Sequence, residues 1–187
     1  MNTFSRNGIA DYFYSKYKDD FHEFVETYYQ WGNKNYKLYN ASGLPFIKDK
    51  KRFENRMSCP QVLDVLESLE NELKKMEPDL SVEEILATPG IHGTLNERFD
   101  SSQYSYSNSL YAKTGTIYYV SALAGTLNTQ NKRLIFASLG RGPYKKSYQG
   151  IRRFEESWID LFIEDFDGPL VYEKPVKKRF FHLRSLM

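Results

Sequence analysis

The sequence contains very little cysteine and histidine. Its 187 residues include a single cysteine, Cys59, so no disulfide can form within the chain and no cysteine cage for a metal is available. The three histidines, His22, His92 and His182, show none of the spacings typical of a metal site. These shortages argue against metal catalysis, and we expect neither a metal nor another cofactor.

Long apolar runs and an excess of one charge are also missing. No stretch reaches the roughly 20 apolar residues that a transmembrane helix needs, and residues 1–6 lack the apolar core of a signal peptide. The net charge is only +2, which gives no general attraction to nucleic acid. With 41% hydrophobic residues, the chain has the composition of a globular protein and the length for one domain with a proper core.

The first half of the sequence predicts two helices separated by a loop. One helix would run from Ser5 to about Trp31, with aromatic residues near helical spacing. Residues 33–57 read as a loop. The segment Ser58–Gln61 has the form of a capping box, and the apolar stripe from Val62 to Met76 is typical of a core helix.

The second half predicts a sheet between two helices. A short helix is expected at 81–85, followed by a strand around Lys113 and strands at 120–127 and 133–139, the last two joined by a hairpin turn. A final helix is expected at about 148–165. Its larger apolar residues are predicted to face the sheet, namely Phe154, Trp158, Leu161 and Phe162.

The most informative motif is Lys113-Thr114-Gly115-Thr116, which stands at the start of an apolar, β-prone segment. A lysine supplies positive charge for a ligand carboxylate, and a threonine hydroxyl can donate a hydrogen bond to it. A glycine removes a side chain where a ligand must lie against the strand. Alone the motif is weak, because a solvated strand end would look the same. A phosphate-binding loop is a poorer interpretation, since no glycine-rich turn precedes the lysine.

Other segments occur around this motif in a fixed order. They are Ser5-Arg6-Asn7, then Tyr39–Leu44 leading to Asn55–Ser58, and then Pro89–Leu95 followed by Arg98-Phe99. Together with the lysine motif they resemble the C-terminal half of the penicillin-binding D-alanyl-D-alanine carboxypeptidases of the peptidase S13 type. The resemblance extends over most of the chain, and four ordered blocks are much more specific than any one of them.

The resemblance implies the fold. We expect an α+β domain of the β-lactamase and transpeptidase-like kind, in which helices flank both faces of an antiparallel sheet, with the N-terminal nucleophile portion missing. Residues 1–167 would form this partial domain. Residues 168–187 would form a basic tail, either solvated or in weak contact with an anionic surface.

The resemblance also assigns three catalytic and three substrate-binding residues, which are Ser5, Asn7, Lys113, Thr114, Gly115 and Thr116. Ser5 would shuttle a proton and Asn7 would hold the substrate amide. Lys113 and Thr114 would hold the terminal carboxylate, while the strand beyond the glycine would align the peptide and help to form the oxyanion hole.

The acylated serine of the family is the exception. It belongs to a Ser-x-x-Lys motif upstream of Ser-x-Asn, and the one match to that spacing, Ser15 and Lys18, falls on the wrong side of Ser5. We therefore expect these two residues to be solvated surface. The predicted function is that of a serine-type D-Ala-D-Ala carboxypeptidase or endopeptidase of peptidoglycan that is inactive alone. The alternative is a non-catalytic remnant that binds peptidoglycan peptides or a partner protein.

The expected partners follow from that function. They are a peptidoglycan stem peptide or a β-lactam, and an N-terminal portion of the same enzyme, but not nucleic acid. A member of this family would act in the periplasm or otherwise outside the cytoplasmic membrane.

Overall fold

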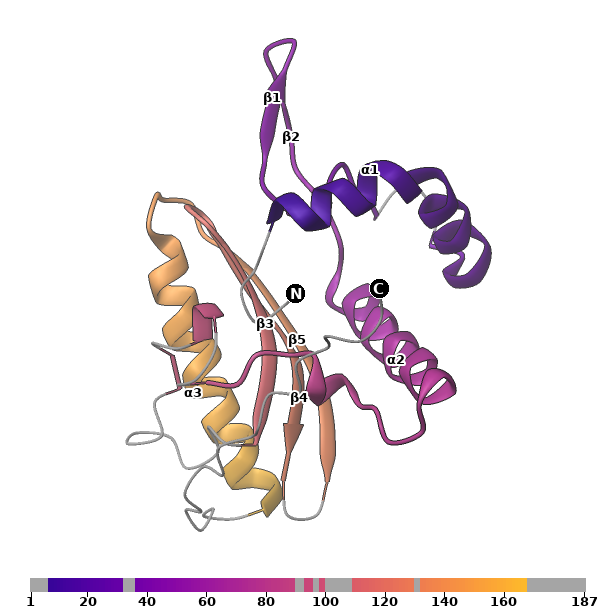
Figure 1. The fold of residues 1–187 in the computed structure, drawn as a ribbon. Helices are drawn as coiled ribbons and strands as arrows, with labels where there is room; N and C mark the ends of the chain where they lie inside the picture. Colours follow the sequence, from indigo (N-terminus) through magenta and orange to yellow (C-terminus); the bar gives the residue numbers. More distant parts are fainter. Residues whose placement is uncertain are drawn as a thin grey trace.

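The computed structural model describes residues 7–31, 36–89, 93–95, 98–99, 109–129 and 132–167, with the backbone alone for residues 7–9, 93 and 162–167. Its centre is an antiparallel sheet in the order β3-β4-β5, made of β3 (Leu110–Ile117), β4 (Val120–Asn128) and β5 (Arg133–Arg141). Helix α2 (Cys59–Met76) covers one face and α3 (Ser147–Asp167) the other (Figure 1). The predicted α+β fold with helices on both faces is confirmed.

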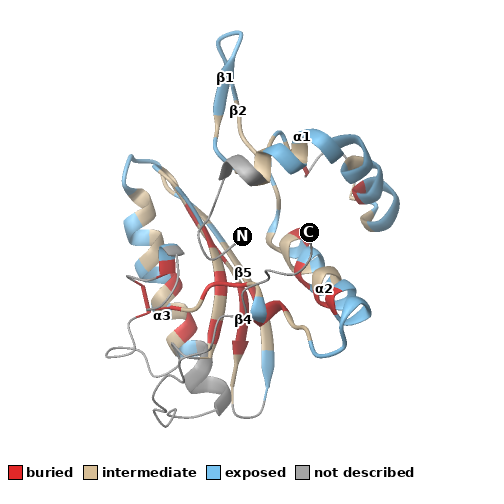
Figure 2. Cartoon of the chain, viewed as in Figure 1, coloured by how far each residue is buried: buried red, intermediate tan, exposed pale blue. Residues whose placement is uncertain are grey.

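The alternation of side chains along the strands produces two cores, one under each helix (Figure 2). The core under α3 includes Leu110, Ala112, Leu123, Leu127, Phe136 and Ile159. The core under α2 includes Leu66, Leu73, Val82 and Leu86, with Tyr111, Ala124 and Ile135 packed against it. Even-numbered residues of β3 therefore face α3 and odd-numbered residues face α2.

The start of α2 is as predicted, but the loop before it is not. The backbone N–H of Ser58 donates to Oε1 of Gln61 at 2.8 Å, which confirms the capping box. Within the predicted loop, a hairpin is formed by β1 (Phe46–Lys48) and β2 (Lys51–Phe53). The prediction was wrong because the turn uses Asp49 and Lys50 at φ values of 50° and 60°, without the glycine that usually signals such a hairpin.

The first helix forms where the sequence predicts it, and most of its large aromatic residues are exposed. Helix α1 (Asn7–Phe24) continues into a π-helical turn, η2 (Val25–Tyr29). Six of the aromatic residues in this segment are between 39% and 62% exposed, namely Tyr12, Phe13, Tyr17, Phe21, Phe24 and Tyr28. The aromatic stripe was therefore correctly located on a helix, but no described segment covers it.

Two of the segments that carry the family resemblance meet through side-chain hydrogen bonds. Oδ1 of Asn55 accepts from the backbone N–H of Tyr39 at 2.8 Å, and its Nδ2 donates to the carbonyl of Asn40 at 2.7 Å. The same loop reaches α1, because the N–H of Ser42 donates to Oδ1 of Asp11 at 2.8 Å. These residues thus fix the position of α1, the helix on which Asn7 lies.

Arg133 fastens α2 and the short 3-10 helix η3 (Val82–Glu84) to the sheet. Its Nη2 donates to Oε2 of Glu70 at 2.9 Å and its Nε to Oε1 of Glu83 at 2.7 Å. Burial of Glu83 opposes its ionisation, but the hydrogen bond and charge of Arg133 outweigh burial and lower the pKa of this carboxyl to about 2. The ion pair therefore depends on pH.

We expect Glu83 to make the fold sensitive to acid. Because the pKa of its carboxyl falls from 4.5 to about 2 on folding, the contribution is fully present above pH 4.5 and is lost as the pH falls toward 2. The loss in unfolding free energy should be about 3 kcal/mol. Urea unfolding should be measured between about pH 6 and pH 2.5, a range in which a carboxyl group titrates. The unfolding free energy should change less with pH in Glu83→Gln than in the parent. Parallel profiles would contradict this role.

Fewer apolar residues of the last helix pack on the sheet than the sequence predicted. Trp158 packs on Phe136 of β5, with ring centroids 5.9 Å apart, but Phe154 and Leu161 are 63% and 64% exposed. Phe162 and the tail at 168–187 lie outside the residues whose side chains are described. In the described part of the chain, no helix combines the length and the apolar character required to span a membrane.

Candidate functional site

Lys113 lies on β3, the strand at one edge of the described sheet. It is on the α2 side of the strand, and its Nζ donates to the backbone carbonyl of Thr114 at 2.6 Å. Partial burial lowers the pKa of its ammonium group. No carboxylate of the described residues forms an ion pair with Lys113, so its charge is available to an anionic ligand.

The two threonines of the motif face the other side of the strand. Thr114 is buried, and its hydroxyl is hydrogen-bonded to that of Thr94 in the 3-10 helix η4 (Gly93–Leu95). Thr116 is exposed, and its hydroxyl accepts a hydrogen bond from Nη2 of Arg152 at 2.9 Å. A carboxylate bound by both Lys113 and a threonine hydroxyl would therefore have to lie at the outer edge of β3.

The backbone of β3 directs every second pair of its N–H and C=O groups to that outer edge. Ala112 exchanges two hydrogen bonds with Ala87, of 2.9 and 3.2 Å, so its N–H and C=O point away from β4. In an antiparallel strand the same direction recurs every second residue, which brings the backbone groups of Thr114 and Thr116 to the outer edge as well. Within the described part of the chain, no residue bonds to the N–H of Thr116. An extended peptide can pair with such an edge.

Gly115 leaves open space on the strand that the fold itself does not need. A Cβ at this position would meet only Cβ of Ala122, at an ordinary 3.5 Å. Gly125 on β4 is different, because a Cβ there would overlap the carbonyl oxygen of Tyr111 and approach Cα of Ala112 to 2.6 Å. Packing thus explains Gly125 but not Gly115. Open space of this kind on a strand would suit a ligand that approaches the backbone closely.

Alanine at these two glycines should separate binding from folding. We expect Gly115→Ala to change the unfolding free energy by less than about 0.5 kcal/mol but to weaken binding of a D-Ala-D-Ala peptide by about 1–3 kcal/mol through overpacking. Gly125→Ala should lower the unfolding free energy by a similar 1–3 kcal/mol or more. Thermal unfolding and a peptide titration measure the two effects. Unchanged peptide affinity in a folded Gly115→Ala variant would remove this glycine from the site.

The other predicted catalytic residues are less completely described. Asn7 is the first residue of α1, but its side chain lies outside the described residues, as does all of Ser5. Their approach to Lys113 stays a prediction. Ser15 and Lys18 are exposed on α1, and the Ser15 hydroxyl donates to the carbonyl of Tyr12 at 2.8 Å. Their predicted solvated position is confirmed.

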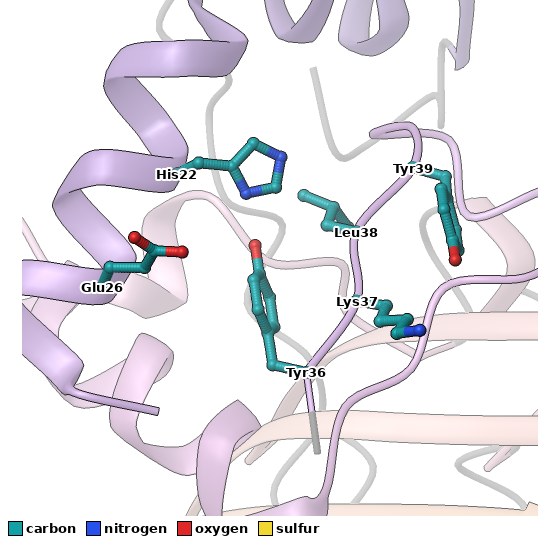
Figure 3. A pocket seen from close by; sticks show the side chains of 6 residues that line it. All are labelled: His22, Glu26, Tyr36, Lys37, Leu38 and Tyr39. Carbon is teal, nitrogen blue, oxygen red and sulfur yellow. The ribbon is translucent and has the colours of Figure 1, made fainter. Parts of the chain in front are cut away.

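A shallow pocket of about 420 Å³ lies between α1 and residues 36–39 (Figure 3). It is lined by His22, Glu26, Tyr36, Lys37, Leu38 and Tyr39. Burial, together with the nearby Tyr14, raises the pKa of the Tyr36 hydroxyl to about 12, so this group stays protonated. Lys113 and the other site residues on β3 do not line this pocket, which is therefore separate from the edge of β3.

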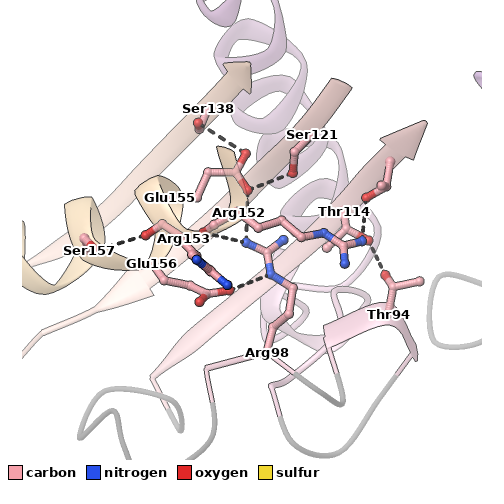
Figure 4. Close-up of polar contacts among 11 residues, drawn as sticks. Thr94, Arg98, Thr114, Ser121, Ser138, Arg152, Arg153, Glu155, Glu156 and Ser157 are labelled. Carbon is pink, nitrogen blue, oxygen red and sulfur yellow. Dashed lines mark hydrogen bonds and ion pairs between the residues drawn. The ribbon is translucent and has the colours of Figure 1, made fainter. Parts of the chain in front are cut away.

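A buried ionic cluster supports the α3 side of the site, and we name it the Arg98 cluster (Figure 4). Nη2 of Arg98 donates to Oε2 of Glu155 at 2.9 Å, and its Nε donates to Oε1 of Glu156 at 3.0 Å. The Ser121 hydroxyl donates to the same oxygen of Glu155 at 2.9 Å. The cluster joins the segment after η4 to α3 and β4, and thereby holds Thr94 against β3.

Sequence reasoning missed most of this support. Arg98 was noted only as part of a resemblance, and Thr94, Arg152 and Glu155 received no role. The one available signal was helical periodicity, since Glu155 falls four residues before the buried Ile159 on the same face of α3. A charged residue on a core-facing position indicates a buried partner, but not which one.

The sequence matches one protein family over more than half of its length. Residues 33–154 match the model of the D-Ala-D-Ala carboxypeptidase 3 (S13) family. No curated protein sequence matches the chain.

Solved structures of similar fold support this match. The penicillin G-acylated predatory endopeptidase Bd3459 from Bdellovibrio bacteriovorus, in complex with immunity protein Bd3460, has a TM-score of 0.78 at 22% identity, over 95% of this chain and 47% of that one. Penicillin binding protein 4 (dacB) from Haemophilus influenzae has a TM-score of 0.61 at 20% identity, over 87% of this chain and 38% of that one. At these identities the likeness shows the fold, and the chain spans less than half the length of either protein.

Proposed function

Because the chain belongs to the D-Ala-D-Ala carboxypeptidase 3 (S13) family, we propose that it forms the substrate-recognition half of a penicillin-binding serine peptidase. Its substrates would be the D-Ala-D-Ala ends or D-amino-acid cross-links of peptidoglycan stem peptides. The observation that carries this proposal is the outer edge of β3. It combines the N–H of Thr116, to which no described residue bonds, the ammonium group of Lys113 without a described carboxylate partner, and a glycine that packing does not require.

In this proposal the stem peptide pairs with the backbone of Thr114 and Thr116 as an added strand. Lys113 binds the terminal carboxylate, and the N–H of Thr116 faces the carbonyl oxygen that becomes negatively charged during attack. Asn7, the first residue of α1, would hold the substrate amide, and Ser5 would move a proton. The chemical step itself needs a serine activated by a neighbouring base, which forms and then releases an acyl-enzyme.

We propose that the activated serine is supplied by a further polypeptide segment, equivalent to the part of the related structures that this chain does not cover. The surface that fits such a segment is the outer edge of β5, which pairs only with β4 among the described strands. Phe154 and Leu161 are exposed on the flank of α3 that also carries Trp158, whose ring packs on β5. An unpaired edge beside exposed apolar side chains favours the addition of strands. Because peptidoglycan lies outside the cytoplasmic membrane, the assembled protein would act there.

A non-catalytic role in binding peptidoglycan peptides is the alternative. It is favoured by one observation, which is that the described residues include recognition groups but no activated serine. Ser15 lies on an exposed helix, and its hydroxyl donates to the carbonyl of Tyr12 rather than to a base. Peptide binding without turnover by the fully assembled protein would select this alternative.

We expect the isolated chain not to form a stable acyl-enzyme with a fluorescent penicillin, because acylation needs a serine within hydrogen-bond reach of a base. Gel fluorescence and intact-mass measurement check this result. An adduct on Ser15 or Ser5 would contradict it and would identify the nucleophile within this chain. Labelling that appears only after a Ser-x-x-Lys segment is supplied would support the proposed two-part enzyme. Absence of labelling together with absence of peptide binding would reject the proposed function.

A further inference from the structure

Arg152 on α3 differs from the other arginines that approach the sheet. Arg98 and Arg133 each bind two carboxylates, at distances between 2.7 and 3.0 Å. Arg152 forms no ion pair within the described part of the chain, and its Nε is buried without a hydrogen-bond partner there. A guanidinium group has five N–H donors and cannot lose its charge in a protein. Arg152 thus retains both charge and donors for another group.

The surroundings of Arg152 hold this guanidinium group beside β3. Its Nη2 donates to the hydroxyl of Thr116 at 2.9 Å, and its Cζ lies 5.1 Å from the centre of the Tyr148 ring. Its backbone carbonyl accepts from Nη2 of Arg98 at 3.5 Å, which ties this turn of α3 to the Arg98 cluster. Figure 4 shows the Arg152 side chain running from α3 toward the strand that carries Thr114. Contacts with Arg98 at the backbone carbonyl, with the Tyr148 ring and with the Thr116 hydroxyl therefore hold the Arg152 side chain in this position.

The hydrogen bond between Arg152 and Thr116 also sets the direction of the hydroxyl. Because the Thr116 oxygen accepts from the guanidinium group, its own proton is free to be donated to a further acceptor. An exposed donor next to an arginine at the edge of a strand suits a carboxylate, which accepts charge-assisted hydrogen bonds from both. The fold places this pair on the α3 side of β3, whereas Lys113 lies on the α2 side.

We propose that Arg152 and the hydroxyl of Thr116 form the second half of the carboxylate site, opposite Lys113. This inference rests on the proposed function, since the carboxylate is that of a D-Ala-D-Ala terminus paired with the edge of β3. The ligand class is thus a peptide with a free C-terminal carboxylate. Lys113 would bind this carboxylate from the α2 side of β3, and Arg152 and Thr116 from the α3 side. Arg152 would be a specificity-determining residue, which distinguishes a free terminus from an amidated or extended one.

The test compares N-acetyl-D-Ala-D-Ala with its C-terminal amide, titrated into the parent chain, Arg152→Ala and Arg153→Ala. Arg153 is the matched control, because it is an exposed arginine adjacent on the same helix. We expect Arg152→Ala to weaken binding of the acid by about ten- to a hundredfold, which is the effect of removing one charge-assisted contact. Binding of the amide should be unchanged, Arg153→Ala should bind both ligands like the parent, and Arg152→Lys should recover part of the lost affinity.

Two results would overturn the inference while leaving the proposed function intact. One is an acid affinity that falls in Lys113→Ala but not in Arg152→Ala. The other is an equal loss of acid and amide affinity in Arg152→Ala, which would mean that the arginine only maintains the shape of the edge. A parent chain that binds neither ligand would overturn the inference and the proposed function together.

Discussion

Replacing Arg98 by alanine is expected to cost the fold about 3–5 kcal/mol, the typical loss when one partner of a buried ion pair is removed. The side chains of Arg98 and Glu155 are only 4% and 0% exposed. Without the guanidinium group, the carboxylate of Glu155 would keep hydroxyl donors such as that of Ser121, but no opposite charge. A loss of this size is a large part of the stability of an ordinary domain.

Urea unfolding of Arg98→Ala measures this effect, and two further variants make it specific. Arg52→Ala removes an exposed ion pair with Glu54 and should cost less than about 1 kcal/mol. The double variant Arg98→Met/Glu155→Leu should be more stable than Arg98→Ala, because the fully buried carboxylate of Glu155 is removed together with its partner. An Arg98→Ala variant that unfolds at the same urea concentration as Arg52→Ala would show that the cluster contributes little.

The second large effect is expected at Lys113. Replacing it by alanine should weaken binding of a D-Ala-D-Ala peptide by about 1.5–3 kcal/mol, because a charge-assisted contact to the carboxylate is lost. The affinity of the parent should also fall at high pH. Burial lowers the pKa of Lys113 below 10.5, so the ammonium group loses its proton, and with it the attraction for a carboxylate, at a lower pH than an exposed lysine would.

Calorimetric titration of the peptide should be carried out at about pH 7, where an ordinary lysine is charged, and at about pH 10, close to its ordinary pKa. It measures both the loss of affinity in Lys113→Ala and the fall of the parent's affinity at high pH. Lys48→Ala, on the exposed hairpin strand β1, is the matched control and should bind like the parent at both pH values. Equal affinity in the parent and in a folded Lys113→Ala variant would show that Lys113 takes no part in binding the ligand.

The sequence was sufficient to predict the parts of the fold that depend on local patterns. The capping box at Ser58 and the apolar stripe of α2 specify one helix with its start and its buried face. The apolar alternation of β3, β4 and β5 and the turn between the last two specify an antiparallel sheet. These signals span only a few residues each, so no knowledge of distant contacts was needed.

Features that depend on distant contacts could not be predicted in this way. Phe154 and Leu161 have the helical spacing of core residues, but the described part of the sheet ends at β5 and does not reach them. The spacing predicts which residues share a face of a helix, and not how far the neighbouring sheet extends.

In the candidate site, too, local motifs could be predicted and distant contacts could not. The motif at Lys113 was visible in the sequence, whereas the pairing of Arg98 with Glu155 joins residues 57 positions apart. The alternation of the strand, which separates the side of Lys113 from that of Thr114, was available in the sequence and was not used. The contact of Arg152 with Thr116 depends on the packing of α3 and had no sequence signal of its own.

Hydrogen exchange at the edge of β3 tests the central claim most directly. The amides of Thr114 and Thr116 point to the outer edge, whereas that of Gly115 faces β4 and is paired in the free protein. Saturation with a D-Ala-D-Ala stem peptide should slow exchange of the Thr116 amide while leaving that of Gly115 unchanged, and the L-Ala-L-Ala peptide should have no effect. If the D-Ala-D-Ala peptide binds without slowing exchange at Thr116, the edge of β3 is not where this protein holds its ligand.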